Sequence, residues 1–204
     1  MQSEEQLRQD SRALRRAAWT SIAFVLLLWV LFLIELATGF EAFRLGIYPR
    51  RPEAISGILF APLIHADAVH LLSNSLPLFV LGCGTLYLYR RVALPVLLFI
   101  YLGGGLAIWL FARPSYHIGA SGLTYGMAAF IFFCGVLRRD PPAIALALIV
   151  TFLYGAMIWG LFPIERGVSW ESHLFSALAG AIAAFAYRLL LPPEPEAPDM
   201  EAEE

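Results

Sequence analysis

Six long apolar stretches limit what this chain can fold into more than any other feature of its sequence. A transmembrane helix needs about 20 mostly apolar residues, and each stretch is long enough. The composition agrees, because 59% of the residues are hydrophobic and 15% are charged, whereas about a quarter are charged in a soluble domain. The sequence therefore predicts an all-α, polytopic membrane protein. The expected spans are Ala17–Thr38, Val69–Tyr89, Val92–Ala112, Ile118–Leu137, Ala143–Pro163 and Trp170–Leu190.

The chain is expected to form one membrane domain with short polar ends. Its first apolar run exceeds the roughly 7–15 residues of a signal-peptide core, so we interpret it as a retained helix that follows a cytoplasmic segment at 1–16. Residues 17–190 would form the six-helix domain, with a long outer loop at about 39–68 that lies partly in the membrane interface. Residues 191–204 are rich in Pro and Glu and are predicted to be a disordered tail.

Arginine placement predicts the orientation, because cytoplasmic flanks retain positive charge. With the N-terminus inside, nine arginines flank the inner side and five flank the outer side, which favours an N-in, C-in topology. The inner set is Arg8, Arg12, Arg15, Arg16, Arg90, Arg91, Arg138, Arg139 and Arg188, and the outer set is Arg44, Arg50, Arg51, Arg113 and Arg166.

Several classes of function are not expected. The net charge is only −2, without a continuous cationic surface, so nucleic acid is not an expected partner. Cys83 and Cys134 lie inside apolar runs, where they behave as small hydrophobes. The four histidines include no H-x3-H or H-E-x-x-H pair on one helical face, so no metal site is predicted.

Four polar side chains lie near the outer ends of three expected spans. They are His70 and Asn74, Ser121, and His173. At a rise of about 1.5 Å per residue, each lies one or two turns below the outer surface. Such groups are costly inside a bilayer, and their shared depth predicts a functional site between the three helices.

Small residues predict that two of these helices pack closely. Close approach would bring the Ser121 hydroxyl within hydrogen-bond reach of His173, as a nucleophile and its general base require, although such stripes are also generic packing. The small residues are Gly119, Gly122 and Gly126 on the fourth span and Ser172, Ser176, Gly180 and Ala184 on the sixth.

Three motifs together resemble the rhomboid intramembrane serine proteases. They are His-Ile-Gly-Ala-Ser-Gly at 117–122, the H-x4-H-x3-N pattern of His65, His70 and Asn74, and Ser-His-Leu-Phe-Ser-Ala-Leu-Ala-Gly at 172–180. The resemblance covers Gly39 to Leu190 in order and spacing. It implies the six-helix bacterial core of that family, in the bacterial inner membrane, with an active site that opens to the outer face.

The resemblance also implies roles for individual residues. Ser121 would be the nucleophile and His173 its base, while His70, Asn74 and the Ser121 backbone amide would form the oxyanion hole. Tyr125 matches the family tyrosine that packs against the catalytic imidazole. Gly119 and His65 would support the site.

The implied activity is a serine endopeptidase that cleaves peptide bonds in or near transmembrane segments of other membrane proteins. Its partners would be those substrates and the lipid bilayer, with no cofactor or metal. A catalytically inactive rhomboid-like protein that binds or chaperones membrane helices is the main alternative, and loss of Ser or His would indicate it. A transporter would show repeat symmetry and helices broken at mid-membrane depth.

Two departures from the family pattern affect packing. Ser56 and Gly57 stand where many members carry Trp-Arg, which bears on the conformation of the long loop. Ser176 stands where many carry glycine, three residues after His173. Serine is small, so close helix packing is expected to survive.

Other polar residues have expected structural roles. His65 would hydrogen-bond backbone, and Glu35 would snorkel or bond into the long loop. His117 lies four residues before Ser121 and is an alternative base, although an exposed or capping position is favoured. Asp67 and Glu171 lie near site histidines, and either remains open as a third catalytic member.

Overall fold

The structure is a computed structural model that describes residues 4–138, 144–146, 148–149, 152, 159–164 and 167–190. Within these residues it is helical, and the β-structure is a single antiparallel bridge between Ile47 and His117. The long helices are α1 (Glu4–Thr38), α3 (Ala68–Leu88), α4 (Ala93–Phe111), α5 (Ser121–Arg138) and α8 (Trp170–Leu190), and a four-residue helix, α2 (Gly57–Phe60), lies in the long loop.

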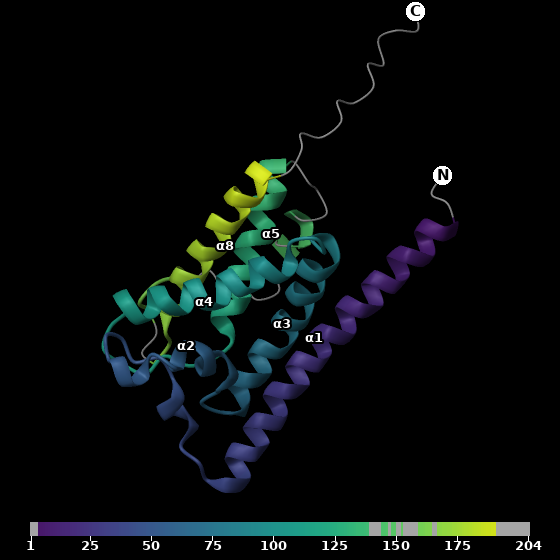
Figure 1. Cartoon of the computed structure of the whole chain (residues 1–204). Coiled ribbons are helices and arrows are strands. Elements are labelled where there is room, and N and C mark those ends of the chain that lie inside the picture. The colour runs from purple at the N-terminus through teal and green to yellow at the C-terminus, as the bar shows by residue number, and fades with distance from the viewer. Residues whose placement is uncertain are drawn as a thin grey trace, which may run out of the picture.

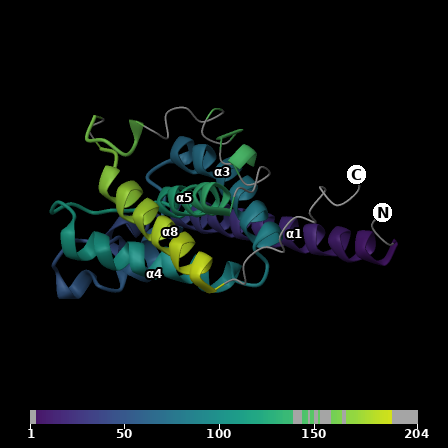
Figure 2. The same cartoon turned by 90° about the horizontal axis from the view of Figure 1, so that it is seen from above.

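Helix α5 lies at the centre of the bundle and contacts α3, α4 and α8 (Figure 1). The view from above shows α8 running beside α4 and α5 (Figure 2). Helix α1 packs along α3 at the edge. The main apolar core lies between these helices, and its fully buried side chains include Leu28, Leu71, Leu81, Ile100, Phe130 and Ile131.

The helices are apolar on the outside as well as inside. Within the described residues, α1, α3 and α4 are long and apolar enough to cross a membrane, and α5 contains a shorter apolar stretch. Their outward faces expose large apolar side chains, including Leu36, Val69 and Phe111. A soluble protein rarely exposes so much apolar surface, and the prediction of a helical integral membrane protein is confirmed at this level. About half of the expected fifth span, Ala143–Pro163, falls outside the described residues, and the orientation stays a prediction.

Two expected helix boundaries differ from the structure. The first helix does not begin at Ala17, because α1 is continuous from Glu4 and extends beyond the rest of the bundle (Figure 1). At about 1.5 Å per residue its 35 residues reach well past the roughly 30 Å of a bilayer core. Helix α5 begins at Ser121 and not at Ile118, because Gly119 has a φ of +107° and His117 pairs with Ile47.

The small-residue faces of α5 and α8 meet as predicted. A Cβ on Gly180 would lie 2.0 Å from the Gly126 carbonyl oxygen, so the two backbones touch there. Ser176 fits this interface because two glycines make room for its hydroxyl: a Cβ on Gly122 would lie 2.8 Å from Ser176 Oγ, and one on Gly104 would lie 2.7 Å from it. The close packing expected in spite of Ser176 is therefore confirmed.

The long loop is anchored to α4 by its polar groups. Arg50, which has a φ of 60°, donates from Nη1 to the carbonyl oxygens of Leu110 and Ala112 at 3.2 and 2.9 Å. These carbonyls are unpaired at the end of α4, so the arginine satisfies them. The Gly57 backbone lies against Gly46, and a Cβ there would be 2.3 Å from the Gly46 carbonyl oxygen. The close approach explains why this loop has glycine, and not arginine, at position 57.

Candidate active site

Ser121 and His173 meet at the end of the bundle that carries the long loop. Ser121 is the first residue of α5, and His173 lies in the first turn of α8. Ser121 Oγ lies 2.8 Å from His173 Nε2, an ordinary hydrogen-bond distance. His173 is 7% exposed, whereas Ser121 is partly buried. The arrangement places a partly buried hydroxyl against a nitrogen of a buried imidazole.

The other nitrogen of His173 fixes the state of the imidazole. His173 Nδ1 lies 2.8 Å from the carbonyl oxygen of Gly160. A carbonyl only accepts hydrogen bonds, so Nδ1 carries the proton and Nε2 of the neutral ring holds the free lone pair. That lone pair faces Ser121 and can accept the serine proton.

Tyr125 and Gly160 enclose the imidazole. The rings of Tyr125 and His173 are stacked, with centroids 4.1 Å apart and planes inclined by 7°. A Cβ on Gly160 would lie 2.2 Å from the Tyr125 hydroxyl oxygen and 3.0 Å from His173 Nδ1. Sequence reasoning missed Gly160, because it lies in no motif and only its position in space reveals its contact with the site.

Gly119 allows His70 to approach the residues before Ser121. A Cβ at Gly119 would lie 2.7 Å from His70 Cε1, and the φ of +107° also disfavours any other residue. The amide of Gly119 donates to the carbonyl of Ala61 at 2.9 Å. Gly119 was expected on the α5 face that meets α8, and that prediction is wrong because the residue precedes the helix and faces His70 instead.

His65 supports the same short segment. Its Nε2 accepts a hydrogen bond from the Ala120 amide at 3.3 Å, and its ring meets the His70 ring edge-on with centroids 5.1 Å apart. The expected bond to backbone is confirmed. Burial first, and then the charge of His70, lower the pKa of His65 to about 4. His65 is therefore neutral near pH 7 and keeps its acceptor.

Asn74 has a buried donor that lacks a partner in the part of the chain that the structure describes. The side chain is 6% exposed, and its amide nitrogen has no hydrogen-bond partner among the described residues. An unmet buried donor costs about 1–3 kcal/mol, so such groups are rare unless a site uses them.

Both carboxylates near the histidines make structural contacts. Asp67 caps α3 by accepting the His70 amide at 2.8 Å. Glu171 lies 3.4 Å from the guanidinium of Arg113.

Two further polar residues were assigned roles from the sequence. Glu35 accepts the Ala42 amide at 3.2 Å, as expected of a residue that bonds into the long loop. The expectation of an exposed or capping position for His117 is wrong, because it is 1% exposed and its ring nitrogens bond Arg113 and Ser169 and not the start of α5.

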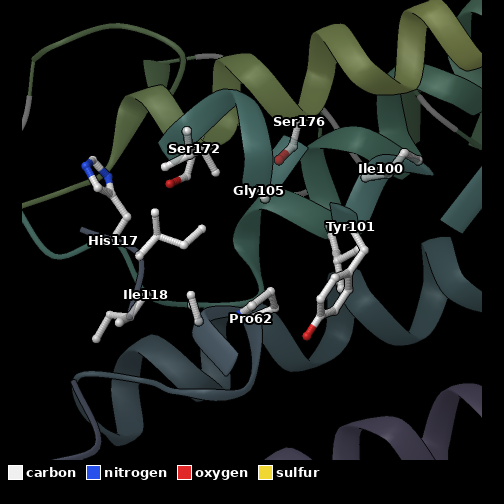
Figure 3. Close-up of a pocket in the computed structure, with 14 residues that line it drawn as sticks. Pro62, Ile100, Tyr101, Gly105, His117, Ile118, Ser172 and Ser176 are labelled. Atoms are coloured by element: carbon white, nitrogen blue, oxygen red, sulfur yellow. The ribbon is translucent and has the colours of Figure 1, made fainter. Parts of the chain in front are cut away.

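A small cavity is lined by residues of the long loop, α4, α5 and α8 and of the segment before Ser121. Its volume of about 30 Å³ is close to that of two or three water-sized spheres and is too small for a large side chain. In Figure 3, His117 and Ser172 lie on one side of this cavity, and Tyr101 lies on the other.

Comparison with known proteins gives the family. The family model of the rhomboid domain matches residues 52–189. Uncharacterised proteins of Mycobacterium tuberculosis and Mycobacterium bovis are each 38% identical over 188 residues, which cover 87% of this chain and 77% of the relative. An uncharacterised protein of Mycobacterium leprae is 35% identical over 196 residues, with coverages of 88% and 76%.

The fold and the site define a helical integral membrane protein with a hydrogen-bonded Ser–His pair. The chain belongs to the rhomboid family, a family of intramembrane protease-like proteins.

Proposed function

We propose that this protein is an intramembrane serine endopeptidase that cleaves peptide bonds in or near transmembrane segments of other membrane proteins. The observation that carries the proposal is the hydrogen bond between Ser121 Oγ and His173 Nε2, in the tautomer that the Gly160 carbonyl selects. A serine hydroxyl is a weak nucleophile until a neighbouring base accepts its proton. The pair provides this base.

The reaction divides into two acyl-transfer steps. His173 accepts the Ser121 proton while Oγ attacks the substrate carbonyl carbon, and the resulting imidazolium returns the proton to the leaving amine. A water then attacks the acyl-enzyme by the same route and releases the acid product. Tyr125 stacks on the imidazole and holds its plane, and the face of an aromatic ring also attracts the imidazolium that forms.

The developing oxyanion needs donors. His70, Asn74 and the Ser121 amide are the proposed set, and the unpaired buried amide of Asn74 supports its part in it. In soluble serine proteases one such donor is worth roughly 3–4 kcal/mol of transition-state stabilisation.

A transmembrane substrate must unwind before it can be cleaved. Its peptide carbonyls are held in i to i−4 hydrogen bonds and cannot reach a nucleophile. We therefore expect cleavage near the outer interface of the bacterial inner membrane, at small or helix-breaking residues. The alternative, an inactive protein that binds membrane helices, is less well supported because it gives the bonded pair no role.

The test is cleavage of a model transmembrane substrate by the purified full chain. Ser121→Ala and His173→Ala are each expected to reduce turnover by at least about 10³-fold, since each removes one half of the dyad. Ser56→Ala is the matched control, because Ser56 is an exposed loop serine. A variant of the pair that folds and keeps wild-type turnover would contradict the assignment.

A further inference from the structure

His117 is a fully buried histidine to which the proposed reaction gives no role. It is 1% exposed and lies in the short loop between α4 and α5, four residues before Ser121. Its backbone forms both hydrogen bonds of the bridge to Ile47, at 2.9 and 3.0 Å, and so holds the long loop. Its side chain reaches in another direction, toward α8.

The ring of His117 is part of a hydrogen-bonded chain whose direction is fixed. Nε2 lies 3.0 Å from the carbonyl of Arg113, so it carries the proton and donates to that oxygen. Nδ1 is then the acceptor, and it receives the hydroxyl proton of Ser169 at 2.5 Å. The Ser169 oxygen in turn accepts from the Ser172 hydroxyl at 2.5 Å.

Ser169 links these hydrogen bonds to the backbone of His173. It lies directly before α8 and caps the helix, since its Oγ accepts the amide of Ser172 at 3.4 Å. Its carbonyl oxygen accepts the amide of His173 at 3.4 Å. Ser169 therefore binds the His117 ring through its hydroxyl and the His173 backbone through its carbonyl.

Arg113 strengthens the same contact from the beginning of the loop. Its Nη2 donates to the carbonyl of Val168 at 2.6 Å, and its guanidinium lies 3.4 Å from Glu171. The loop from Arg113 to Ala120 thus contacts Val168, Ser169 and Glu171 around the start of α8. The same loop runs directly into Ser121. One short segment carries the serine and holds the helix that carries the histidine.

We propose that His117 is a positioning residue that fixes the Ser121–His173 distance by binding the Ser169 cap of α8. This inference rests on the proposed function of the pair. His117 does not touch the reacting atoms, and it acts through Ser169. A displacement of about 1 Å between reacting groups can reduce turnover by about 10²-fold, which is why a link of this kind matters.

Charges around His117 are compatible with this role. Burial lowers the pKa of His117, while the Arg113 carbonyl and Glu171 oppose that shift and the Arg113 guanidinium adds to it. The side chain is therefore neutral near pH 7, and Nδ1 remains an acceptor for Ser169.

The experiment measures the rate at which a fluorophosphonate probe labels Ser121 in the purified full chain, together with kcat and KM for a model substrate. His117→Phe keeps a ring of similar size and removes both hydrogen bonds. We expect at least about tenfold slower labelling and lower kcat, with unchanged KM and complete labelling at long times.

His117→Gln, which retains a donor and an acceptor, is expected to recover part of the loss. Tyr116→Phe is the control from the same loop, and it is expected to label at the wild-type rate.

A double-mutant cycle tests the path through Ser169. Ser169→Ala should slow labelling as well, and the double variant His117→Phe/Ser169→Ala should be no slower than the slower single variant. Additive effects would overturn the proposal. So would a reduced labelled fraction in which each labelled site reacts at the wild-type rate, because that pattern indicates lost folding. If His117→Phe does not fold, Ser169→Ala tests the proposal instead. Wild-type kcat and labelling rate in that variant would overturn the proposal. Absence of labelling in the wild type, with Ser121→Ala as the blank, would instead contradict the proposed function and this inference with it.

Discussion

At the scale of single residues, the candidate site depends on neutral histidines whose proton positions are set by backbone. The Gly160 carbonyl selects the tautomer of His173, and the Arg113 carbonyl selects that of His117. His65 accepts the Ala120 amide. A backbone carbonyl or amide cannot change its charge with pH, so these contacts make each ring an acceptor toward the group it serves.

His65 makes the stability of the folded protein depend on pH. Its pKa is about 4 in the folded state, below the ordinary 6.5, because burial disfavours the charged ring. The folded state therefore binds fewer protons than the unfolded state between these values. The stabilisation is fully present above about pH 6.5 and is lost as the pH falls toward 4, by at most about 3 kcal/mol.

Thermal unfolding in detergent at pH 7.5 and pH 4.5 measures this effect. His65→Gln keeps an acceptor that does not titrate, so its Tm should change less between the two pH values than the wild-type Tm does. Equal changes in Tm for both proteins would show that His65 does not contribute.

At the scale of helices, the sequence predicts the bounds of the long apolar helices but not the contacts between residues that are far apart in the chain. The bounds of α3, α4 and α8 agree closely with the apolar runs, because lipid-exposed helices are apolar along their whole length. The start of α5 differs because the bridge to Ile47 overrides the apolar run. The contact of Gly160 with His173 and that of Ser169 with His117 carry no sequence signal, since each joins residues far apart in the chain.

The α5–α8 interface gives a prediction at this scale. A methyl group on Gly180 would lie 2.0 Å from the Gly126 carbonyl oxygen, so Gly180→Ala must push the helices apart. We expect a loss of about 1–3 kcal/mol in stability and a lower rate of cleavage, because Ser121 and His173 lie on these two helices.

Gly103→Ala is the matched control for this substitution. The three atoms nearest to its new methyl group would all belong to Phe99, at ordinary contact distances of 3.6–3.8 Å, and alanine favours the helix by about 1 kcal/mol. Both variants are compared by Tm and by substrate cleavage. A Tm for Gly180→Ala equal to that of Gly103→Ala would contradict the predicted backbone contact.

At the scale of the whole molecule, the two ends of the bundle differ in character. One end carries the long loop, the start of α8 and the Ser121–His173 pair (Figure 1). The other end carries the N-terminal part of α1 and the turn between α3 and α4, where Arg90 lies 3.5 Å from Asp10. The sequence predicts both groups of residues, because the arginine pattern separates the ends and the polar layer marks one of them.

The orientation of these ends is the last prediction. Cytoplasmic flanks retain arginine, so the end with Arg90 should face the cytoplasm and the end with Ser115 should face outward. Single cysteines at positions 90 and 115, in a chain without Cys83 and Cys134, report which end is accessible. A membrane-impermeant maleimide should label position 115 in intact cells and position 90 only after permeabilisation. The reverse pattern would place the Ser121–His173 pair at the cytoplasmic face, and substrates would then have to be cut near their inner ends. Because both positions lie outside the membrane-spanning helices at opposite ends of one bundle, each outcome assigns the face of the site directly.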